Sequence, residues 1–387
     1  MKMRRTLSFC QVCIRWLYLT VLFASCSAIS DQCVAQDSKL AADKLAQVDA
    51  AVSQFMTSTH VPGISVAIVE NRELEWAQGF GFADLENNVP ASKYTLFRLG
   101  SISKPLTATA AMLLSERGRL DLDAPVQKYC PAFPQKPWPI STRQVLGHLG
   151  GIRHYKSESQ DDSELGNTKH FDNPIQAGLN FFKDDPLVAQ PGTSFHYSTQ
   201  GYTLVGCVIE GASGATYVEF MRQNIFLPAK MEQTQVDDRF AIIPYRTRFY
   251  EQKDAGPVRN ADFLDSSYKI PAGGWLSSAE DMGRFEVAIL NDKLIRRDTR
   301  KLMWTPLKPT DGPLNGYALG WGWSTPMEHE VAGVGHTGGQ QGTSTAFVIA
   351  PDQGAGVVVL TNLEDQPAGD LARTILNILV TSAENKH

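Results

Sequence analysis

Residues 101–118 read SISKPLTATAAMLLSERG, and this stretch decides the fold. Leu106, Ala110, Leu113 and Leu114 recur at helical spacing, and further alanines fill much of the remaining helix surface. Gly118 is typical of the position just beyond a helix end. Because a helix that is apolar on several sides is buried, the stretch predicts a central helix over residues 101–117.

β structure is predicted on both sides of this helix in the sequence. Residues 64–69 and 74–80 are strand-like runs around a polar turn and predict an antiparallel hairpin. Helical periodicity is present near both ends of the chain, and further strand candidates lie at residues 317–324, 330–336, 343–350 and 356–362.

If the first and last strands join one sheet, the middle of the chain becomes an inserted helical region. We therefore predict an α+β fold, a sandwich of an antiparallel sheet and flanking helices. Residues 39–95 plus 270–387 form the sheet and its helices, residues 96–269 form the helical region, and the active site lies at their interface.

The composition excludes several functional classes. A hydrophobic content of 43% and a charged content of 20% are ordinary for a soluble globular protein. The net charge of −5, with scattered basic residues, gives no electrostatic footprint for nucleic acid or an anionic membrane. The eight histidines show no metal-binding spacing, so neither a metal nor another cofactor is predicted. The oligomeric state stays open.

The first 35 residues predict a secretory signal peptide. Four basic residues precede the apolar run 16–24, and small residues follow at 25–28. The run is shorter than the ~20 residues that a membrane-spanning helix needs. We predict cleavage after Ala28 or Ala35, a periplasmic or extracellular protein, and no membrane span once the leader is removed. A lipoprotein anchor at Cys26 and an uncleaved anchor are the alternatives.

Only two of the six cysteines lie beyond this leader. Cys130 and Cys207 both have apolar sequence neighbours, and these two cysteines do not form a CxxC pair. Because the chain is long enough to build a large core, we predict buried free thiols. A single disulfide between the two is the alternative.

Ser101 and Lys104 are a candidate nucleophile and base. Residues three apart share one face of a helix, so the hydroxyl and the amine can touch. Burial disfavours the charged ammonium, and a neutral amine can take the serine proton. The helix N-terminus offers backbone N–H groups to a developing oxyanion. Taken alone, the pattern also fits a helix cap beside a solvated lysine.

Two further motifs carry polar groups that a hydrolase could use. A tyrosine near a lysine can relay protons, and adjacent glycines let a substrate approach the backbone closely. A strand edge can also pair with a peptide-like ligand. The candidates are Tyr197 and Thr199 in the second motif, and His336, Thr337, Gly338 and Gly339 in the third.

The three motifs in this order resemble the serine β-lactamase and DD-peptidase superfamily, in particular its class C and carboxypeptidase branch. Residues 148–155, 197–199 and 267–269 are most similar to mitochondrial β-lactamase-like serine proteins and their bacterial relatives. The resemblance implies that Ser101 is acylated while Lys104 and Tyr197 shuttle protons. It also implies an oxyanion hole from the Ser101 and Gly339 amides, and substrate contacts from His336, Thr337, Gly338 and Thr199.

Two departures from the family pattern bear on the substrate. Thr199 replaces the usual Asn, and a hydroxyl cannot reproduce both amide contacts. His336 replaces the frequent Lys, and an unperturbed imidazole is mostly neutral at pH 7. We therefore expect a weaker hold on substrate carboxylates, with carboxylate-dependent activity rising on acidification toward the His336 pKa.

The sequence thus predicts an exported serine hydrolase that acts through an acyl-enzyme on amide or ester bonds. Peptidase or esterase action is favoured over true β-lactamase activity. The expected partner is a small-molecule or peptide substrate: a peptidoglycan peptide, an ester or a β-lactam. The alternative from another class is a non-catalytic extracytoplasmic scaffold or binding module.

Overall fold

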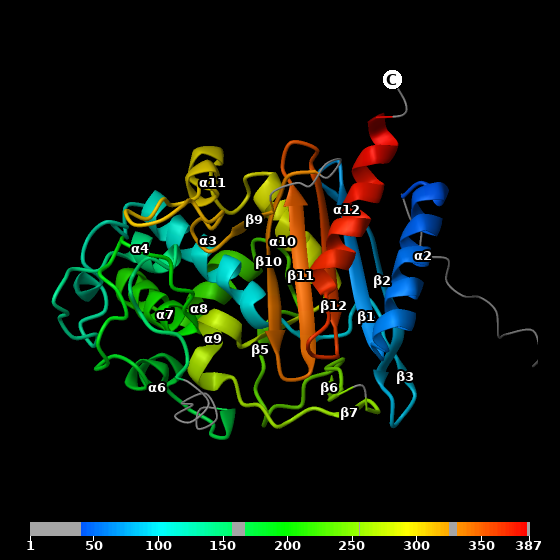
Figure 1. Ribbon diagram of the computed structural model, residues 1–387, viewed down its shortest axis with the longest axis horizontal. Helices are drawn as coiled ribbons and strands as arrows, with labels where there is room; N and C mark the ends of the chain where they lie inside the picture. The colour runs from blue at the N-terminus through cyan, green and yellow to red at the C-terminus, as the bar shows by residue number, and fades with distance from the viewer. Residues whose placement is uncertain (1–39, 157–166, 255, 325–330, 385–387) are drawn as a thin grey trace, which may run out of the picture. The chain divides into compact units, whose positions relative to one another are not determined.

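The computed structural model describes residues 40–156, 167–254, 256–324 and 331–384. Its largest element is a seven-stranded antiparallel sheet in the order β3-β2-β1-β12-β11-β10-β9 (Figure 1). The strands are β1 (Gly63–Glu70), β2 (Glu73–Asp84), β3 (Val89–Pro90), β9 (Gly322–Ser324), β10 (Gly333–Gln340), β11 (Thr343–Ala350) and β12 (Ala355–Thr361).

The first and last long strands are neighbours, as the sequence predicts. β1 pairs antiparallel with β12, with Val66 opposite Val359, and β1 also pairs with β2 as the predicted hairpin. Both β1 and β12 are almost wholly buried, which explains their continuous apolar runs. The predicted α+β class, with an antiparallel sheet flanked by helices, is confirmed.

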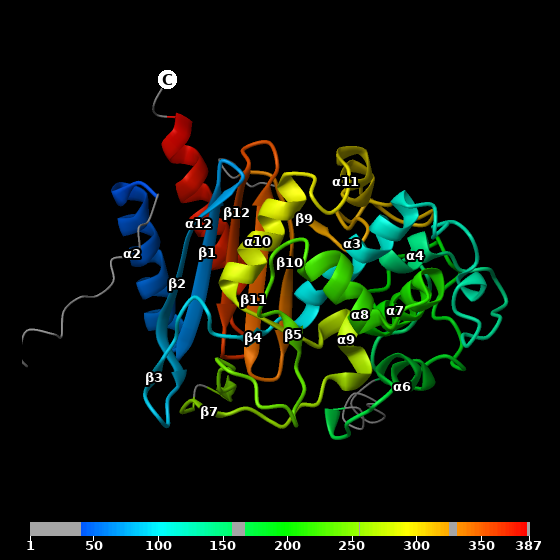
Figure 2. The ribbon, with the colours of Figure 1, turned by 180° about the vertical axis from the view of Figure 1, so that it is seen from behind.

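Helices cover both faces of this sheet (Figures 1 and 2). On one face, α2 (Ala42–Thr59) and α12 (Ala368–Glu384) pack together over a core that includes Val66 and Ile68. On the other face, α10 (Ala279–Leu290) and the helical region share a core with Ala67 and Val69. Both cores are built from residue 40 onward, and residues 40–387 form a compact unit by themselves.

The helical region is arranged around α3 (Ser103–Glu116), whose residues 103–114 are all buried. The predicted central helix is therefore confirmed, but it begins two residues later than expected. Ser101 lies instead on a short 3-10 turn, η1 (Gly100–Ile102). The other helices of this region are α4 (Thr142–Leu146), α6 (Pro174–Asn180), α7 (Thr199–Ser213), α8 (Tyr217–Met221) and α9 (Ile270–Gly273).

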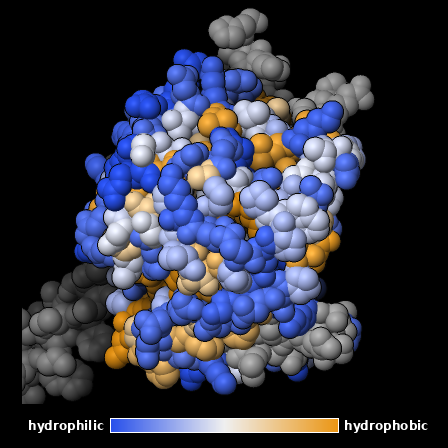
Figure 3. Space-filling view, turned by 90° about the vertical axis from the view of Figure 1, so that its left-hand side faces the viewer, coloured by the Kyte–Doolittle hydropathy of each residue, from blue (hydrophilic) through white to orange (hydrophobic). Residues whose placement is uncertain are grey.

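Shorter elements complete the described parts of the chain. A three-stranded sheet joins β4 (Phe97–Arg98), β8 (Trp275–Ser277) and β5 (Gln235–Val236). A two-stranded sheet joins β6 (Tyr250–Glu251) and β7 (Arg259–Asn260), and α11 (Arg297–Met303) precedes β9. The end of the molecule that carries the helical region shows mostly hydrophilic surface, with apolar atoms in separate patches (Figure 3).

Some sequence predictions are not decided by this structure. The predicted leader, with Cys26 and three other cysteines, lies outside the described residues, and so do residues 157–166. The division into residues 39–95 plus 270–387 and residues 96–269 remains a prediction. Within the described ranges, no helix is both long and apolar enough to cross a bilayer.

Cys130 and Cys207 form a disulfide, so the prediction of free thiols is wrong. The cause is a close approach of two segments that are distant in the sequence. On α7, one turn beyond Cys207, a Cβ on Gly211 would lie 1.7 Å from the carbonyl oxygen of Tyr129. This glycine lets the backbone next to Cys130 touch the helix and brings the two sulfurs together.

Removing the disulfide is expected to lower the free energy of unfolding by about 4 kcal/mol, because it closes a long loop in the unfolded chain. The two cysteines are 77 residues apart. Urea unfolding of Cys130→Ala/Cys207→Ala beside the parent protein, with and without reductant, measures the effect. Reductant should lower the midpoint of the parent protein alone; an unchanged parent midpoint would contradict the prediction.

Candidate active site

Ser101 lies on a turn that is held against strand β10 by glycines. Gly100 has φ +54°, the left-handed conformation that glycine adopts readily. A Cβ on Gly338 would lie 2.2 Å from the Leu99 carbonyl oxygen and 3.0 Å from the Ser101 nitrogen. A Cβ on Gly100 would lie 2.9 Å from the Gly339 nitrogen. The Ser101 and Gly339 backbone nitrogens therefore lie close to the place where Gly100 and Gly338 meet. Two neighbouring amides are what an oxyanion hole requires.

Buried side chains hold the Ser101 turn against β10. Arg98 donates from Nε to Asp237 at 2.7 Å and from Nη1 to the Gln341 carbonyl at 2.9 Å. The Thr345 hydroxyl donates to the Leu99 carbonyl at 2.8 Å. These bonds tie the Ser101 turn to the β10–β11 hairpin and hold the two amides in place without a ligand.

Lys104 is fully buried beside the predicted nucleophile. Its Nζ lies 3.0 Å from Ser101 Oγ, 3.2 Å from the Ala272 carbonyl oxygen and 3.5 Å from Thr199 Oγ1. Desolvation, with a smaller contribution from the Lys269 charge, holds the Lys104 pKa well below its usual range. A neutral amine can donate its two protons to Ala272 and Thr199 while its lone pair accepts the Ser101 proton.

Tyr197 is the third predicted catalytic residue, and the structure places it in the same site. Its ring lies 4.8 Å from Lys104 Nζ, and it lines the same cavity as Ser101. Burial raises the Tyr197 pKa above its usual range, and the nearby Ser101 side chain offsets this only in part. Tyr197 is therefore a neutral phenol at pH 7, able to donate a proton rather than to start the reaction as a base.

A polar cavity of about 170 Å³ opens in front of Ser101. Thr199 and Gly339 line it as predicted, and a Cβ on Gly339 would meet no atom within 4 Å. Lys269 and Asn167 line it as well, with Lys269 Nζ 3.2 Å from Asn167 Oδ1. No role was predicted for these two residues, and the only signal for Lys269 was the Ser-Tyr-Lys run 267–269. The other lining residues are Gly100, His154, Tyr155, Tyr197, Ala272, Gly273, Gln340 and Gln341.

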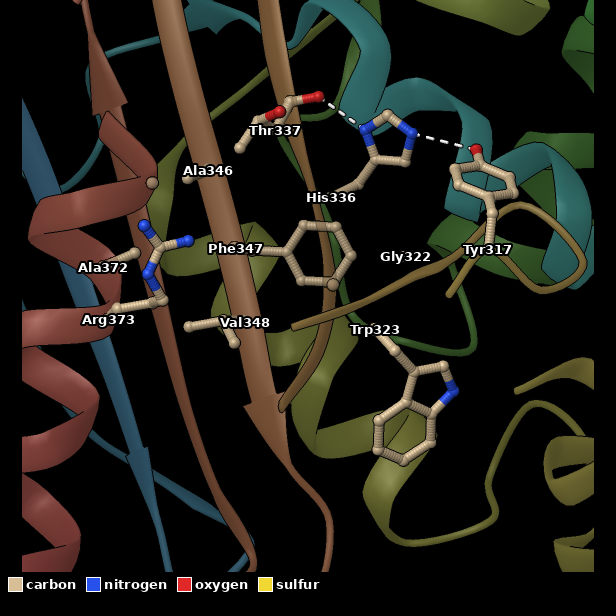
Figure 4. A pocket seen from close by; sticks show the side chains of 12 residues that line it. Tyr317, Gly322, Trp323, His336, Thr337, Ala346, Phe347, Val348, Ala372 and Arg373 are labelled. Atoms are coloured by element: carbon tan, nitrogen blue, oxygen red, sulfur yellow. Dashed lines mark hydrogen bonds between the residues drawn. The ribbon is translucent and has the colours of Figure 1, made fainter. Parts of the chain in front are cut away.

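His336 and Thr337 lie on β10 beyond the cavity (Figure 4). His336 Nδ1 donates to the Thr337 carbonyl at 2.5 Å, and Nε2 accepts from the Tyr317 hydroxyl at 2.9 Å. This pattern fits a neutral imidazole with its proton on Nδ1. Thr337 is exposed at the strand edge, and a more apolar cavity of about 250 Å³ extends from this pair toward α12.

The expected pH response of His336 is wrong. Desolvation, reinforced by the Lys104 charge, lowers the His336 pKa to about 3. Acidification from pH 8 to 5.5 therefore does not charge the imidazole, and carboxylate binding gains nothing from it in that range. A single sequence could not show this, because the shift arises from neighbours that are distant along the chain.

Tyr317 and His148 also belong to the site, although the sequence analysis gave neither a role. The His148 ring lies 4.4 Å from the Tyr197 ring and 4.8 Å from the Tyr317 ring. His148 Nδ1 accepts a hydrogen bond from the Ser198 amide at 3.1 Å. His148 thus positions the second motif. His148 opens the run 148–155 that carries the family resemblance, and this run was the sequence signal for it, whereas Tyr317 stands in no motif.

Removing the Lys269 charge is expected to raise the Lys104 pKa, because a nearby like charge disfavours the ammonium form. In Lys269→Met, acylation at pH 7 should fall several-fold and recover as the pH rises toward 9. Lys269→Arg keeps the charge and should keep the parent pH profile. The pH dependence of single-turnover acylation measures this; identical profiles for Lys269→Met and the parent would contradict it.

Comparison with known proteins agrees with this geometry. The family described as Beta-lactamase matches residues 48–381. The human serine beta-lactamase-like protein LACTB, mitochondrial, is 31% identical over 382 residues, covering 76% of this chain and 69% of that protein. Penicillin-binding protein 4* of Bacillus subtilis is 27% identical over 318 residues, covering 78% and 68%.

A solved structure shows the same fold. The octameric penicillin-binding protein homologue from Pyrococcus abyssi superposes with a TM-score of 0.75 at 26% identity, covering 87% of this chain and 77% of that chain. The superposition includes most of the described sheet and the helical region, so the fold extends well beyond the three motifs.

Proposed function

The chain belongs to the beta-lactamase family, and from this premise we propose that it is an exported serine hydrolase that cleaves amide or ester bonds through an acyl-enzyme on Ser101. The observation that carries the proposal is the buried Lys104 amine, 3.0 Å from Ser101 Oγ. A neutral amine at that distance is a base for the hydroxyl and needs no histidine.

The reaction uses groups that already point at one another. Lys104 takes the proton from Ser101 Oγ, which attacks the substrate carbonyl carbon. The amides of Ser101 and Gly339 hold the oxyanion of the tetrahedral intermediate. The bond to the leaving amine or alcohol breaks as Tyr197 supplies it with a proton, which Tyr197 regains from the Lys104 ammonium. Water then hydrolyses the acyl-enzyme by the reverse proton path.

The surroundings of Ser101 favour peptidase or esterase action over true β-lactamase action. The Thr199 hydroxyl faces Lys104 and offers no amide to a penicillin side chain. The neutral His336 holds a substrate carboxylate weakly. These observations support a small ester or amide, or a peptide, as the substrate.

The proposed export is supported by the Cys130–Cys207 disulfide, since such bonds persist in oxidising compartments. The predicted leader would direct the chain to the periplasm or the cell exterior. Fractionation of cells that express the full chain tests this part. A reduced protein of full leader length in the cytosol would contradict it.

Intact-mass measurement with three acyl donors tests the reaction. A p-nitrophenyl ester, a D-alanine amide and a penicillin are each incubated with the protein, and both the adduct mass and product release are recorded. Turnover of the ester or amide, with only slow release of any penicillin adduct, supports the proposal. Faster turnover of penicillin supports the β-lactamase alternative. No adduct and no turnover with any donor supports the non-catalytic scaffold.

A further inference from the structure

Five exposed apolar side chains gather on one surface that the catalytic mechanism does not use. They are Tyr94, Phe240, Ile242, Tyr245 and Phe263, exposed by 40%, 68%, 98%, 62% and 52%. We propose that this surface, the aromatic patch, docks the protein on an anionic lipid bilayer. The patch consists of these five residues with Arg239 and Arg248. The inference goes beyond the proposed function and does not depend on it.

The members of the aromatic patch come from three separate segments that the fold brings together. The rings of Tyr94 and Tyr245 are 6.3 Å apart. The Arg239 guanidinium lies 4.8 Å from the Phe240 ring and 4.4 Å from the Phe263 ring. A hollow of about 820 Å³ lies beside them, and the patch members that line it are Arg239, Phe240, Ile242, Arg248 and Phe263. In Figure 1 the chain between β5 and β6, which carries residues 239–249, lies at the lower edge of the molecule.

The backbone under the aromatic patch is tied to the body of the protein, which keeps the apolar tip in solvent. The Leu96 amide donates to the Tyr245 carbonyl at 2.9 Å, and the Thr247 hydroxyl donates to the Ala83 carbonyl at 2.8 Å. Arg246 donates to the carbonyls of Asp238 and Ala241. Ile243 is buried, whereas Ile242 beside it is almost fully exposed.

The charge of this segment is opposite to that of the whole protein. Residues 239–249 contain three arginines and no acidic residue, whereas the chain carries a net charge of −5. The nearby acids are largely engaged: Asp237 with Arg98 and Arg246, Asp84 with Arg248, and Asp262 with Lys253. Asp238 accepts from the Phe240 amide. Because Asp237 and Asp84 pair with Arg246 and Arg248, Arg239 is the arginine of this segment for which the described residues show no ion pair, and it carries the positive charge that the segment offers.

An anionic bilayer matches both properties of the aromatic patch. Tyrosine, phenylalanine and isoleucine gain free energy by entering the boundary between headgroups and acyl chains. Arginine can keep its guanidinium at the phosphates while its stem lies on apolar surface. Elsewhere the acidic protein is repelled by an anionic surface, so it approaches with this segment first.

Docking in this orientation would also bring the candidate active site near the bilayer. Arg98 lines the hollow beside the aromatic patch and donates to the Gln341 carbonyl. Gln341 in turn lines the cavity in front of Ser101. The β10–β11 turn lies between the two cavities. The docked bilayer would therefore face the side of the active site that carries this turn.

Vesicle sedimentation tests the proposal. We would use residues 40–387, which hold both complete cores, so that the predicted leader cannot bind lipid itself. The protein is mixed with vesicles of phosphatidylcholine alone or with added phosphatidylglycerol. We expect binding only to the anionic vesicles, weakened by salt. Ile242→Asp and Arg239→Gln/Arg248→Gln should each weaken it at least tenfold.

The matched control is Leu302→Asp, an exposed leucine on α11 with 42% exposure, outside the aromatic patch. It should bind like the parent protein, and thermal unfolding should show that every variant is folded. Failure of the parent protein to sediment with anionic vesicles, or equal binding to neutral ones, would overturn the proposal. So would an Ile242-dependent dimer without vesicle binding, which would assign the surface to self-association.

Discussion

Replacing Ser101 by alanine is expected to abolish the acyl-enzyme and to lower kcat/KM at least about 1,000-fold. The alanine removes the Ser101 oxygen that lies 3.0 Å from Lys104 Nζ. The backbone amides of Ser101 and Gly339 stay where they are. Binding groups and the oxyanion hole remain, so residual activity should reflect these alone. Intact mass after exposure to the ester or penicillin, beside steady-state rates, measures both effects.

Ser103→Ala is the matched control for this experiment. Ser103 is only two residues away and fully buried, and its hydroxyl has no hydrogen-bond partner among the described residues. Its loss should leave both adduct and turnover close to the parent values. An adduct that persists in Ser101→Ala, or one that disappears equally in Ser103→Ala, would remove Ser101 as nucleophile.

Lys104→Arg should also reduce acylation by about 1,000-fold, although it keeps a long basic side chain at this position. A guanidinium does not deprotonate in proteins, so it cannot take the serine proton. In the parent protein burial holds the Lys104 pKa well below its usual range, which favours the neutral amine. Acylation should therefore fall only when acid lowers the pH through that pKa, while the Arg variant shows no such step.

Two further variants separate chemistry from folding. Lys44 is a buried lysine outside the site, paired with Glu70, and Lys44→Arg should leave acylation unchanged. Lys104→Met should be inactive yet more stable at pH 7. Lys104 binds a proton in the unfolded chain and loses it on folding, so its stability cost is greatest below the folded pKa and disappears as the pH rises toward its usual value. Unfolding midpoints measure this; a destabilised Lys104→Met would contradict it.

The fold was predictable where a pattern is local. The hairpin of β1 and β2 follows from two apolar runs around a turn, and α3 follows from its helical spacing. The three motifs identified Ser101, Lys104, Tyr197 and Gly339, which the structure brings together. What failed depends on contacts between distant segments: the disulfide needs α7 to touch Tyr129, and the low His336 pKa comes mainly from burial by segments far away in the sequence.

The same limit explains the residues that had no predicted role. Lys269 acts on Lys104 through space, and Tyr317 reaches His336 from a different segment. Lys269 is marked only by the run 267–269, for which no role was predicted, and Tyr317 stands in no motif. The start of α3 was misplaced for a related reason, because the turn at Gly100 exists to fit β10 rather than to continue the helix.

The glycines around Ser101 differ in the space that they leave for a side chain. Gly100 and Gly338 are closed to any side chain, since backbone atoms occupy the space that a Cβ would need. Gly339 faces open space inside the cavity, although its amide is equally needed. A library that varies only position 339 could therefore narrow the range of accepted substrates while leaving the nucleophile turn intact, which makes this position a natural starting point for redesign.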